Sequence, residues 1–397
     1  MRVLFLLLYH PEPHESSNLY ADLVVEFAKN EHEVVVVSAA KEGDPTTFKK
    51  ENDIAVLRVK TKPFFNVHPV AKGIATLLLP IQFKKAIVKF LSETTFDLIL
   101  APTPPITFVD IISYFKKKYT VKSCLILRDI FPQNARDLGM ISNPLLFHYF
   151  RKKEKKLYRY SDFIGCMSQG NIDYVVNHNP EINRKKLFLL PNWQKAAPLL
   201  ERDESIKEKY GLSGKFVAIF GGNIGEPQKV ENIVTLAKQY QGNDHIVFLI
   251  IGSGARKNYI EQLVIDSALN NVIIKDSLPR SDYEQLVANA DIGLISLSEK
   301  FTIPNIPSKT LSYFNAKIPV LAAIDANTDY GKLLEDSGAG LWSVTGDLET
   351  YKRNFEILYN STELRNKMGE NGYVYLLKHL TVEIACETIV NKTKVDS

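Results

Sequence analysis

Two glycine-rich turns in the second half of the chain have the composition of anion-binding loops. The first, Gly221-Gly222-Asn223-Ile224-Gly225, follows an apolar run over 216–220 and precedes a helical pattern. Glycines let backbone N–H groups approach a phosphate closely, and a helix N-terminus behind them favours negative charge. The second, Gly252-Ser253-Gly254, follows the next apolar run, so both turns are expected at one edge of a parallel sheet. Tight strand-to-helix turns would use the same glycines, and this alternative stays open.

A proline and a lysine mark a further candidate anion site near residue 309. Within Ile303-Pro304-Asn305-Ile306-Pro307-Ser308-Lys309-Thr310, a helix is predicted to begin near Pro307, where no N–H partner is needed. The free N–H groups of Ser308 and Lys309, together with the lysine charge, would suit a diphosphate. The structural alternative is a capped surface helix with a solvated lysine.

The first half offers candidates after two of its predicted strands. Arg128-Asp129 follows a strand over 124–127 and is expected to face an interdomain cleft, with a salt bridge or a helix cap as the structural alternative. His10 lies in the first strand-to-helix loop, where a lone histidine is more often only solvated.

Several common catalytic motifs do not occur in the sequence. There is no P-loop, no complete dinucleotide fingerprint, no nucleophile elbow and no His-Glu-x-x-His. There is also no Asp-x-Asp that would hold Mg²⁺ on a nucleotide sugar. We therefore expect no metal ion and no redox cofactor.

The elements that must position these residues alternate between strand-like and helical patterns. In the first half, strands are predicted over 3–8, 34–37, 54–59, 98–101, 124–127, 163–167 and 187–190, with helices near 19–27, 70–91, 106–118 and 145–160. After an irregular linker over 192–213, the alternation restarts with strands over 216–220, 247–251, 272–274, 292–295 and 320–323. Such alternation predicts parallel sheets built from right-handed crossovers, with ligands at the carboxyl ends of the strands.

Length and composition agree with a globular α/β protein. The 397 residues are 45% hydrophobic and 24% charged, and suggest two or three domains. No apolar run approaches the ~20 residues of a membrane span. The three cysteines lie far apart, which implies no disulfide framework and fits a reducing cytoplasm.

Charge is distributed unevenly along the chain. Residues 1–195 hold 28 Lys and Arg against 19 Asp and Glu, a net charge of +9, whereas the remaining residues carry −5. The positive charge is concentrated over 116–118 and 151–159. These runs are either solvated helix faces or a surface that meets anionic lipid headgroups. Nucleic acid is disfavoured, because no zinc-finger spacing or RNA-binding aromatic motif accompanies the charge.

Taken in order, six short motifs resemble the retaining glycosyltransferases of the GT-B fold, family 4. They lie over 1–5 with 32–36, 129–132, 190–192, 222–228, 290–294 and 307–309. Within this family the chain resembles the bacterial surface-polysaccharide branch that includes the fucosaminyl transferases. It departs from the family in that Pro304 and Ser312 replace two glutamates, the second of which grips the nucleotide ribose. Asn223 and Gln228 replace a phosphate-binding arginine and lysine, which leaves Lys309 as the cation for the diphosphate.

The resemblance implies two doubly wound parallel-sheet, Rossmann-like domains that face a cleft. Residues 1–195 would bind the acceptor, 196–375 would bind the nucleotide sugar, and a C-terminal helix over 376–397 would cross back to the first domain. The site residues that it implies are Asp129, Lys309 and Arg128 for catalysis; Gly222, Asn223, Gln228, Ser253, Pro307, Ser308, Thr310 and Ser312 for the donor; and His10, Ser16 and Ser17 for the acceptor.

The activity implied is sugar transfer, with retention, from a nucleoside diphosphate sugar to a lipid-linked or saccharide acceptor during capsule or O-antigen synthesis. The donor would be a UDP-linked N-acetylated sugar, and no cofactor or metal would be required. The protein would work in the cytoplasm, peripherally on the inner face of the cell membrane through its basic first domain. A UDP-sugar 2-epimerase of the same architecture and a non-catalytic GT-B partner subunit are the alternatives.

Overall fold

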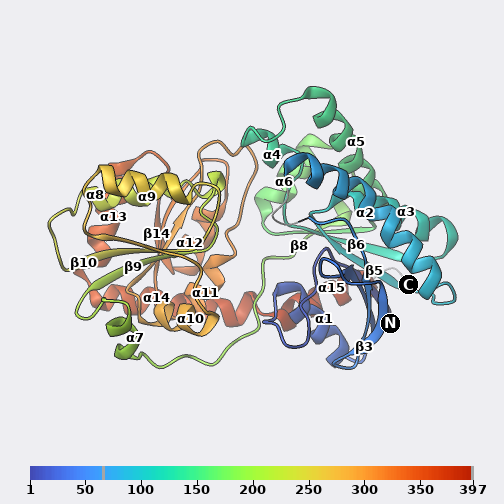
Figure 1. The fold of residues 1–397 in the computed structure, drawn as a ribbon, viewed down its shortest axis with the longest axis horizontal. Coiled ribbons are helices and arrows are strands. Elements are labelled where there is room, and N and C mark those ends of the chain that lie inside the picture. Colours follow the sequence, from blue (N-terminus) through green and yellow to red (C-terminus); the bar gives the residue numbers. More distant parts are fainter. Residues whose placement is uncertain (65–67, 395–397) are drawn as a thin grey trace. The chain divides into compact units, whose positions relative to one another are not determined.

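The computed structural model describes residues 1–64 and 68–394, and the chain divides into two compact units. The first unit combines Met1–Lys195 with Val382–Ser397, and the second is Ala196–Thr381 (Figure 1). The second unit is longer than the predicted 196–375, because helix α14 (Thr362–His379) runs through residue 375. The segment that returns to the first unit therefore begins at Val382 instead of residue 376.

An eight-stranded sheet forms the centre of the first unit, in the order β3-β4-β2-β1-β5-β6-β7-β8. Its strands are β1 (Arg2–Leu6), β2 (Glu33–Ala39), β3 (Thr47–Glu51), β4 (Ile54–Val59), β5 (Leu98–Pro102), β6 (Lys122–Leu127), β7 (Phe163–Cys166) and β8 (Leu187–Leu189). All neighbours are parallel except β3 and β4. The antiparallel β3 was not predicted, because its sequence TFKKE is mostly exposed and lacks an apolar run.

Helices cover both faces of this sheet, as the continuous apolar strands require. They are α1 (Leu19–Lys29), α2 (Pro69–Phe90), α3 (Val109–Lys118), α4 (Gln133–Asp137), α5 (Pro144–Tyr160), α6 (Gln169–His178) and α15 (Val382–Lys394). Helices α1 and α15 lie side by side and share one hydrophobic core with alternate residues of the strands (Figure 1). In that core Phe27 of α1 and Ile389 of α15 are fully buried.

The second unit is a six-stranded, fully parallel sheet in the order β11-β10-β9-β12-β13-β14. The strands are β9 (Phe216–Gly221), β10 (Ile246–Ile251), β11 (Val272–Lys275), β12 (Ile292–Ser296), β13 (Val320–Ile324) and β14 (Gly340–Val344). The other helices of this unit are α7 (Glu204–Lys209), α8 (Glu231–Lys238), α9 (Lys257–Asp266), α10 (Arg280–Asn289), α11 (Lys309–Asn315), α12 (Tyr330–Ser337) and α13 (Leu348–Asn360). Helix α7 lies inside the stretch predicted to be an irregular linker.

Candidate active site

The order of the strands places Gly222 and Lys309 of the second unit near one point of the carboxyl edge of the sheet. Strands β9 and β12 are neighbours, and the chain winds away from them in opposite directions on either side. In such a sheet, the loops after these two strands separate and leave a crevice at the carboxyl edge. Gly222 follows β9 directly, and Lys309 begins the helix that follows β12.

The Lys309 side chain lies across the glycine turn that follows β9. Its Nζ is 3.9 Å from the centroid of the Phe220 ring, a cation–π distance. A Cβ atom on Gly222 would stand 2.6 Å from Cε of Lys309, and Gly222 has a φ of +123°. Glycine is therefore required at 222 for two reasons, its backbone conformation and the space that the lysine occupies.

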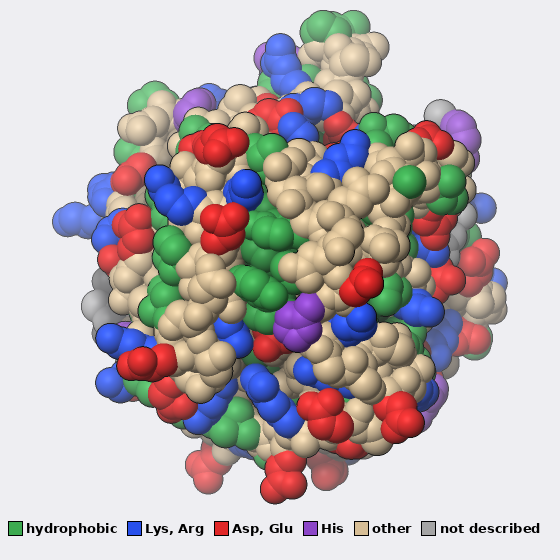
Figure 2. Space-filling model, turned by 90° about the vertical axis from the view of Figure 1, so that its left-hand side faces the viewer, with side chains coloured by type: hydrophobic (Ala, Val, Ile, Leu, Met, Phe, Trp, Pro, Cys, Tyr) green, Lys and Arg blue, Asp and Glu red, His purple; other side chains and the backbone are tan. Residues whose placement is uncertain are grey.

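Lys309 differs from the other cations near this edge in having no carboxylate partner. Burial lowers the pKa of its ammonium to about 8, with no opposing contribution from a nearby acid. The neighbouring cations are all paired: Lys229 with Glu299, Lys300 with Glu226, and Arg256 with Glu226 and Glu231. Figure 2 shows a face of this unit on which basic and acidic side chains are interspersed. Within the described residues, Lys309 keeps an unneutralised charge beside the crevice.

The glycine turns bind each other and do not form an open anion cradle. The Gly222 N–H donates to the Ile251 carbonyl at 2.8 Å, and the Ile224 N–H donates to the Ser253 carbonyl at 2.7 Å. A Cβ on Gly252 would stand 1.8 Å from the Gly222 carbonyl oxygen. These bonds favour the structural alternative for the glycines, and the role of the Gly222 amide in holding a diphosphate stays a prediction.

Two further predicted donor residues form a neutral pair at this edge. The Asn223 side-chain amide donates to Oε1 of Gln228 at 2.8 Å, and both residues lie on the surface. This pair of amides adds hydrogen-bonding groups at the edge but no charge. Ser253 is exposed in the neighbouring turn.

The start of helix α11 differs from the prediction. The helix begins at Lys309 with Ser308 as its N-cap, so Pro307 precedes the helix and does not lie in its first turn. Thr310 is buried and its hydroxyl is 2.6 Å from that of Tyr330, so this contact occupies its side chain, and its role at the donor stays a prediction. Ser312 lies one turn further along the helix and is partly exposed.

In the first unit, the predicted residues His10 and Asp129 lie at the carboxyl edge of the sheet, together with Thr103, which the sequence analysis did not single out. His10 follows β1, Thr103 follows β5, and Asp129 follows β6, and these strands are neighbours in the order β1-β5-β6. The Thr103 hydroxyl accepts hydrogen bonds from the backbone N–H groups of Arg128 at 3.0 Å and Asp129 at 3.3 Å. One buried hydroxyl thus fixes the start of the loop that carries Asp129.

Asp129 and Arg128 have different environments and different roles. Burial raises the pKa of the Asp129 carboxyl to about 6, and the charge of Arg128 opposes this shift only in part. The Arg128 guanidinium donates to the carbonyls of Leu190 at 2.8 Å and Pro191 at 3.3 Å and stacks on Trp193 at 4.6 Å. Arg128 therefore joins the ends of β6 and β8, and its catalytic role stays a prediction.

The His10 loop is held by a buried ion pair that the sequence analysis missed. Arg58 of β4 forms two hydrogen bonds with Glu51 of β3, at 2.9 and 2.7 Å, and donates to the carbonyls of His10 and Pro11 at 2.9 and 3.1 Å. Burial lowers the pKa of the His10 ring to about 4, so this ring is neutral at pH 7. The sequence signal that could have indicated this ion pair is the arginine inside the otherwise apolar strand over 54–59.

The predicted acceptor residues Ser16 and Ser17 lie in the exposed part of the same loop. The Ser17 hydroxyl is 2.5 Å from Oδ1 of Asp22, in the first turn of α1. Ser16 and Ser17 thus lie beyond the fixed His10 carbonyl, nearer to the start of α1. Among the described residues, no group of three or more His, Cys, Asp or Glu side chains has an arrangement that could hold a metal ion.

Comparison with known proteins shows that parts of the chain are similar to glycosyltransferases. Residues 202–375, nearly the whole second unit, match the family model "Glycosyl transferases group 1". The chain is 23% identical over 251 residues to the probable glycosyltransferase WbjE of Pseudomonas aeruginosa, a match that covers 62% of this chain and 61% of WbjE. It is 24% identical over 182 residues to the putative colanic acid biosynthesis glycosyl transferase WcaI of Escherichia coli K12, covering 44% and 43%. The chain thus spans about three fifths or less of each curated relative.

Solved structures support the fold over the whole length of the chain. The structure of HepE from Anabaena in complex with UDP-glucose superposes with a TM-score of 0.69 at 14% identity and covers 99% of both chains. Together with the two sheets described above, this likeness confirms the predicted fold class, an α/β protein of the GT-B type.

Proposed function

We propose that the protein is a group 1 glycosyltransferase that moves a sugar from a nucleoside diphosphate donor to an acceptor, with retention at the anomeric carbon. The observation that carries the proposal is the unneutralised Lys309, which lies against Gly222 at the crevice between β9 and β12. This crevice belongs to the region that matches the family model. The two curated relatives and the solved structure with UDP-glucose support the same reaction class.

The chemistry requires a group that stabilises the leaving diphosphate as it gains negative charge. An ammonium ion in a partly dehydrated site can do this, because its charge is poorly screened there. Lys309 meets this requirement. The reaction also needs a group that orients the acceptor hydroxyl for its attack on the sugar. Asp129 meets this second requirement, because its ionised carboxylate accepts a hydrogen bond from that hydroxyl.

The donor that we propose is a UDP-linked N-acetylated sugar, as in the fucosaminyl-transferase-like branch. A thermal-shift screen with UDP, GDP, ADP and dTDP tests the nucleotide. UDP at 100 times its dissociation constant is expected to stabilise the protein by ~2.7 kcal/mol. A shift with GDP and none with UDP would remove this assignment.

Simple assays distinguish the proposed glycosyltransferase from two alternative functions. A UDP-sugar 2-epimerase would change its sugar without an acceptor, so product formation in the absence of acceptor would favour it. A non-catalytic partner subunit would show no donor binding by calorimetry. We expect donor binding and acceptor-dependent turnover.

Turnover is expected to persist in EDTA. The reason is that the sequence has no Asp-x-Asp, and Lys309 offers the positive charge that a metal ion would otherwise supply. The measurement is the initial rate after dialysis against EDTA, with and without added Mg²⁺ or Mn²⁺. Loss of turnover that either ion restores would contradict the proposal.

The acceptor that we propose is lipid-linked, and the protein would meet it at the inner face of the cell membrane. None of the helices in the described part of the chain has the length and apolar character of a membrane span. The basic run on α5 gives limited support for surface binding, because Arg151 pairs with Glu154, and Lys153 and Lys156 both pair with Asp110.

Helix α2 offers a better lipid-binding surface than α5. Its exposed face carries apolar side chains three to four residues apart, among them Ile74, Leu77 and Ile81, which are 44–54% exposed. Lys84, Lys85 and Lys89 continue this surface and are also exposed. An amphipathic helix with exposed lysines suits an interface of anionic headgroups and acyl chains.

Flotation with anionic liposomes tests this surface. We expect binding at low salt that weakens at high salt, because each lysine near the surface contributes about 1 kcal/mol and is screened by ions. Charge reversal of Lys84, Lys85 and Lys89 to Glu is expected to abolish binding. The matched reversal of Lys152, Lys155 and Arg159 on α5 is expected to have a smaller effect, and the opposite ranking would contradict the choice of α2.

A further inference from the structure

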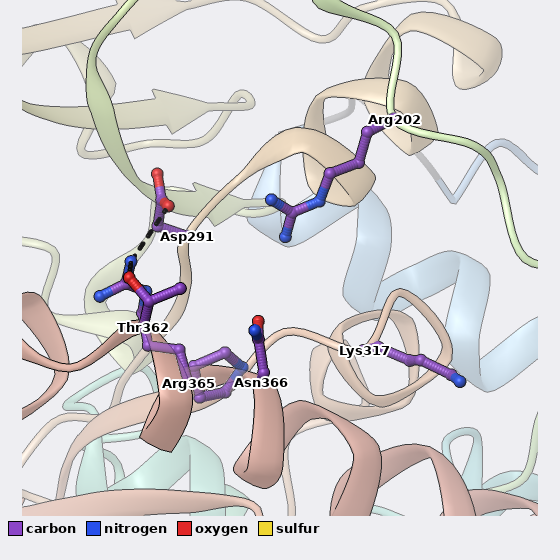
Figure 3. A pocket seen from close by; sticks show the side chains of 7 residues that line it. Arg202, Asp291, Lys317, Thr362, Arg365 and Asn366 are labelled. Atoms are coloured by element: carbon purple, nitrogen blue, oxygen red, sulfur yellow. Dashed lines mark hydrogen bonds and ion pairs between the residues drawn. The ribbon is translucent and has the colours of Figure 1, made fainter.

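A hollow at the amino edge of the second sheet has no role in the function proposed above. It is small and open to solvent, and it is lined by Arg202, Asp291, Lys317, Pro319, Thr362, Arg365 and Asn366 (Figure 3). Asp291 immediately precedes β12, and Pro319 immediately precedes β13. Since Gly222 and Lys309 lie at the carboxyl edge of the same parallel sheet, the hollow is separate from the proposed donor site.

One wall of the hollow is an arginine held in a fixed position. The Arg365 guanidinium donates to the carbonyls of Leu358 at 2.7 Å and Tyr359 at 3.0 Å, and to the Thr362 hydroxyl at 2.9 Å. Its side chain is only 12% exposed, and Asp291 lies 3.9 Å away. The guanidinium is thus preorganised, which reduces the entropy lost when it binds a ligand.

The charges around the hollow do not balance. Asp291 is the one carboxylate that lines it, and this carboxylate also accepts the Val217 N–H at 2.8 Å. Arg202 faces the same space, and its positive charge contributes to lowering the pKa of Arg365, after the larger effect of burial. Lys317 pairs with Glu370 and points away from the others in Figure 3. Two guanidinium groups therefore share one acid.

We propose that this hollow binds a phosphate group between the guanidinium groups of Arg202 and Arg365. In Figure 3 the Arg202 guanidinium points toward Asp291 and Arg365, and the Asn366 amide points into the space between them. Guanidinium groups donate paired N–H groups that match phosphate oxygens, and an amide N–H adds a neutral donor. Asp291 keeps Arg365 oriented and repels anions. A ligand must therefore carry enough negative charge for its attraction to the two arginines to exceed this repulsion.

The bound phosphate group belongs either to inorganic phosphate or to a sugar phosphate. The dissociation constants measured in titrations with each compound distinguish the two sources. The readouts are isothermal calorimetry and the midpoint of thermal unfolding, with potassium chloride at matched ionic strength as the reference. We expect inorganic phosphate or glucose 6-phosphate to raise the midpoint where chloride does not. The ligand that binds at least tenfold more tightly identifies the source.

Arg202→Ala is the decisive variant, because Arg202 is exposed and its loss should leave the fold intact. We expect this change to raise the dissociation constant for phosphate at least tenfold, and Arg202→Lys to restore only part of the affinity. The matched control is Arg353→Ala, which removes an exposed arginine of α13 outside the hollow. Lys309→Ala separates this test from the donor assignment: a loss of phosphate affinity in Lys309→Ala and not in Arg202→Ala would place the phosphate at the donor site and overturn the proposal.

Two results would overturn the proposal. One is a dissociation constant for phosphate that is the same in Arg202→Ala as in the unaltered protein. The other is a response to chloride equal to the response to phosphate, which would show ionic screening without a site.

Discussion

Lys309→Ala is expected to lower kcat by about 100-fold or more, while the donor KM changes much less. Negative charge builds on the diphosphate as the glycosidic bond breaks, so the ammonium stabilises the transition state more than the bound donor. The magnitude follows that of removing one donor from an oxyanion site. Steady-state kinetics with varied donor separate the two constants. Lys309→Arg should recover only part of the rate, because a planar guanidinium does not replace a compact ammonium.

The neighbouring Lys300 provides a matched control for this variant. It lies in the same loop between β12 and α11, but its ammonium already pairs with Glu226. Lys300→Ala should therefore change kcat only a few-fold. Near-normal kcat in Lys309→Ala, or equal losses in both variants, would show that the diphosphate is held elsewhere.

Gly222→Ala should reproduce much of the Lys309 defect without removing the lysine. The new methyl group would stand 2.6 Å from Cε of Lys309 and displace the end of that side chain, and the positive φ adds backbone strain. If the two changes act on one interaction, the double variant should be little worse than Lys309→Ala. Fully additive losses would mean that Gly222 contributes to activity independently of the lysine.

Asp129→Asn is expected to lower kcat/KM by roughly 100-fold or more, the range over which general acid–base groups act. The amide preserves the shape of the side chain but can neither carry a negative charge nor take up a proton. Asp53→Asn, at an exposed carboxylate of the same unit, should have no effect. Activity equal to that of the unaltered enzyme would exclude Asp129 from the reaction.

The same two groups predict the pH profile of kcat/KM. Activity should rise with pH through about 6 as Asp129 loses its proton, and fall through about 8 as Lys309 loses its own. Bound diphosphate favours the charged ammonium, so the alkaline limb of kcat should lie at higher pH than that of kcat/KM. Asp129→Asn should remove the acidic limb alone. A profile that is flat between pH 5 and 9 would contradict both assignments.

Much of the fold could be predicted because its strands are short apolar runs and its helices follow regular spacing. The strand and helix alternation predicted that His10 and Asp129 follow strands and that Lys309 lies at the start of a helix, and the structure has them there. Elements with weak patterns were missed: β3 is mostly charged, and β14 (GLWSV) begins with glycine and is only partly buried. Such strands are stabilised by their neighbours in the sheet, which local sequence does not reveal.

The site was harder to predict, because its geometry depends on contacts between distant segments. Nothing in the sequence shows that Lys309 lies over Gly222, or that the Gly222 amide is already bonded to Ile251. The structural role of Arg128 depends on Trp193, which is 65 positions away. Residue type and spacing indicated which edge of each sheet carries chemistry, but not which donors remain available there.

The return of the chain to the first unit has a consequence for how the protein is made. Helix α15 supplies part of the core beneath α1, yet it is translated after the whole second unit. At the usual rates of synthesis, the 186 residues of Ala196–Thr381 take roughly 10 to 40 s. During that interval, the nascent first unit presents the apolar surface of α1 without its cover. Chaperones at the ribosome therefore have a defined surface to protect, and a premature stop codon just before Val382 would leave it exposed permanently.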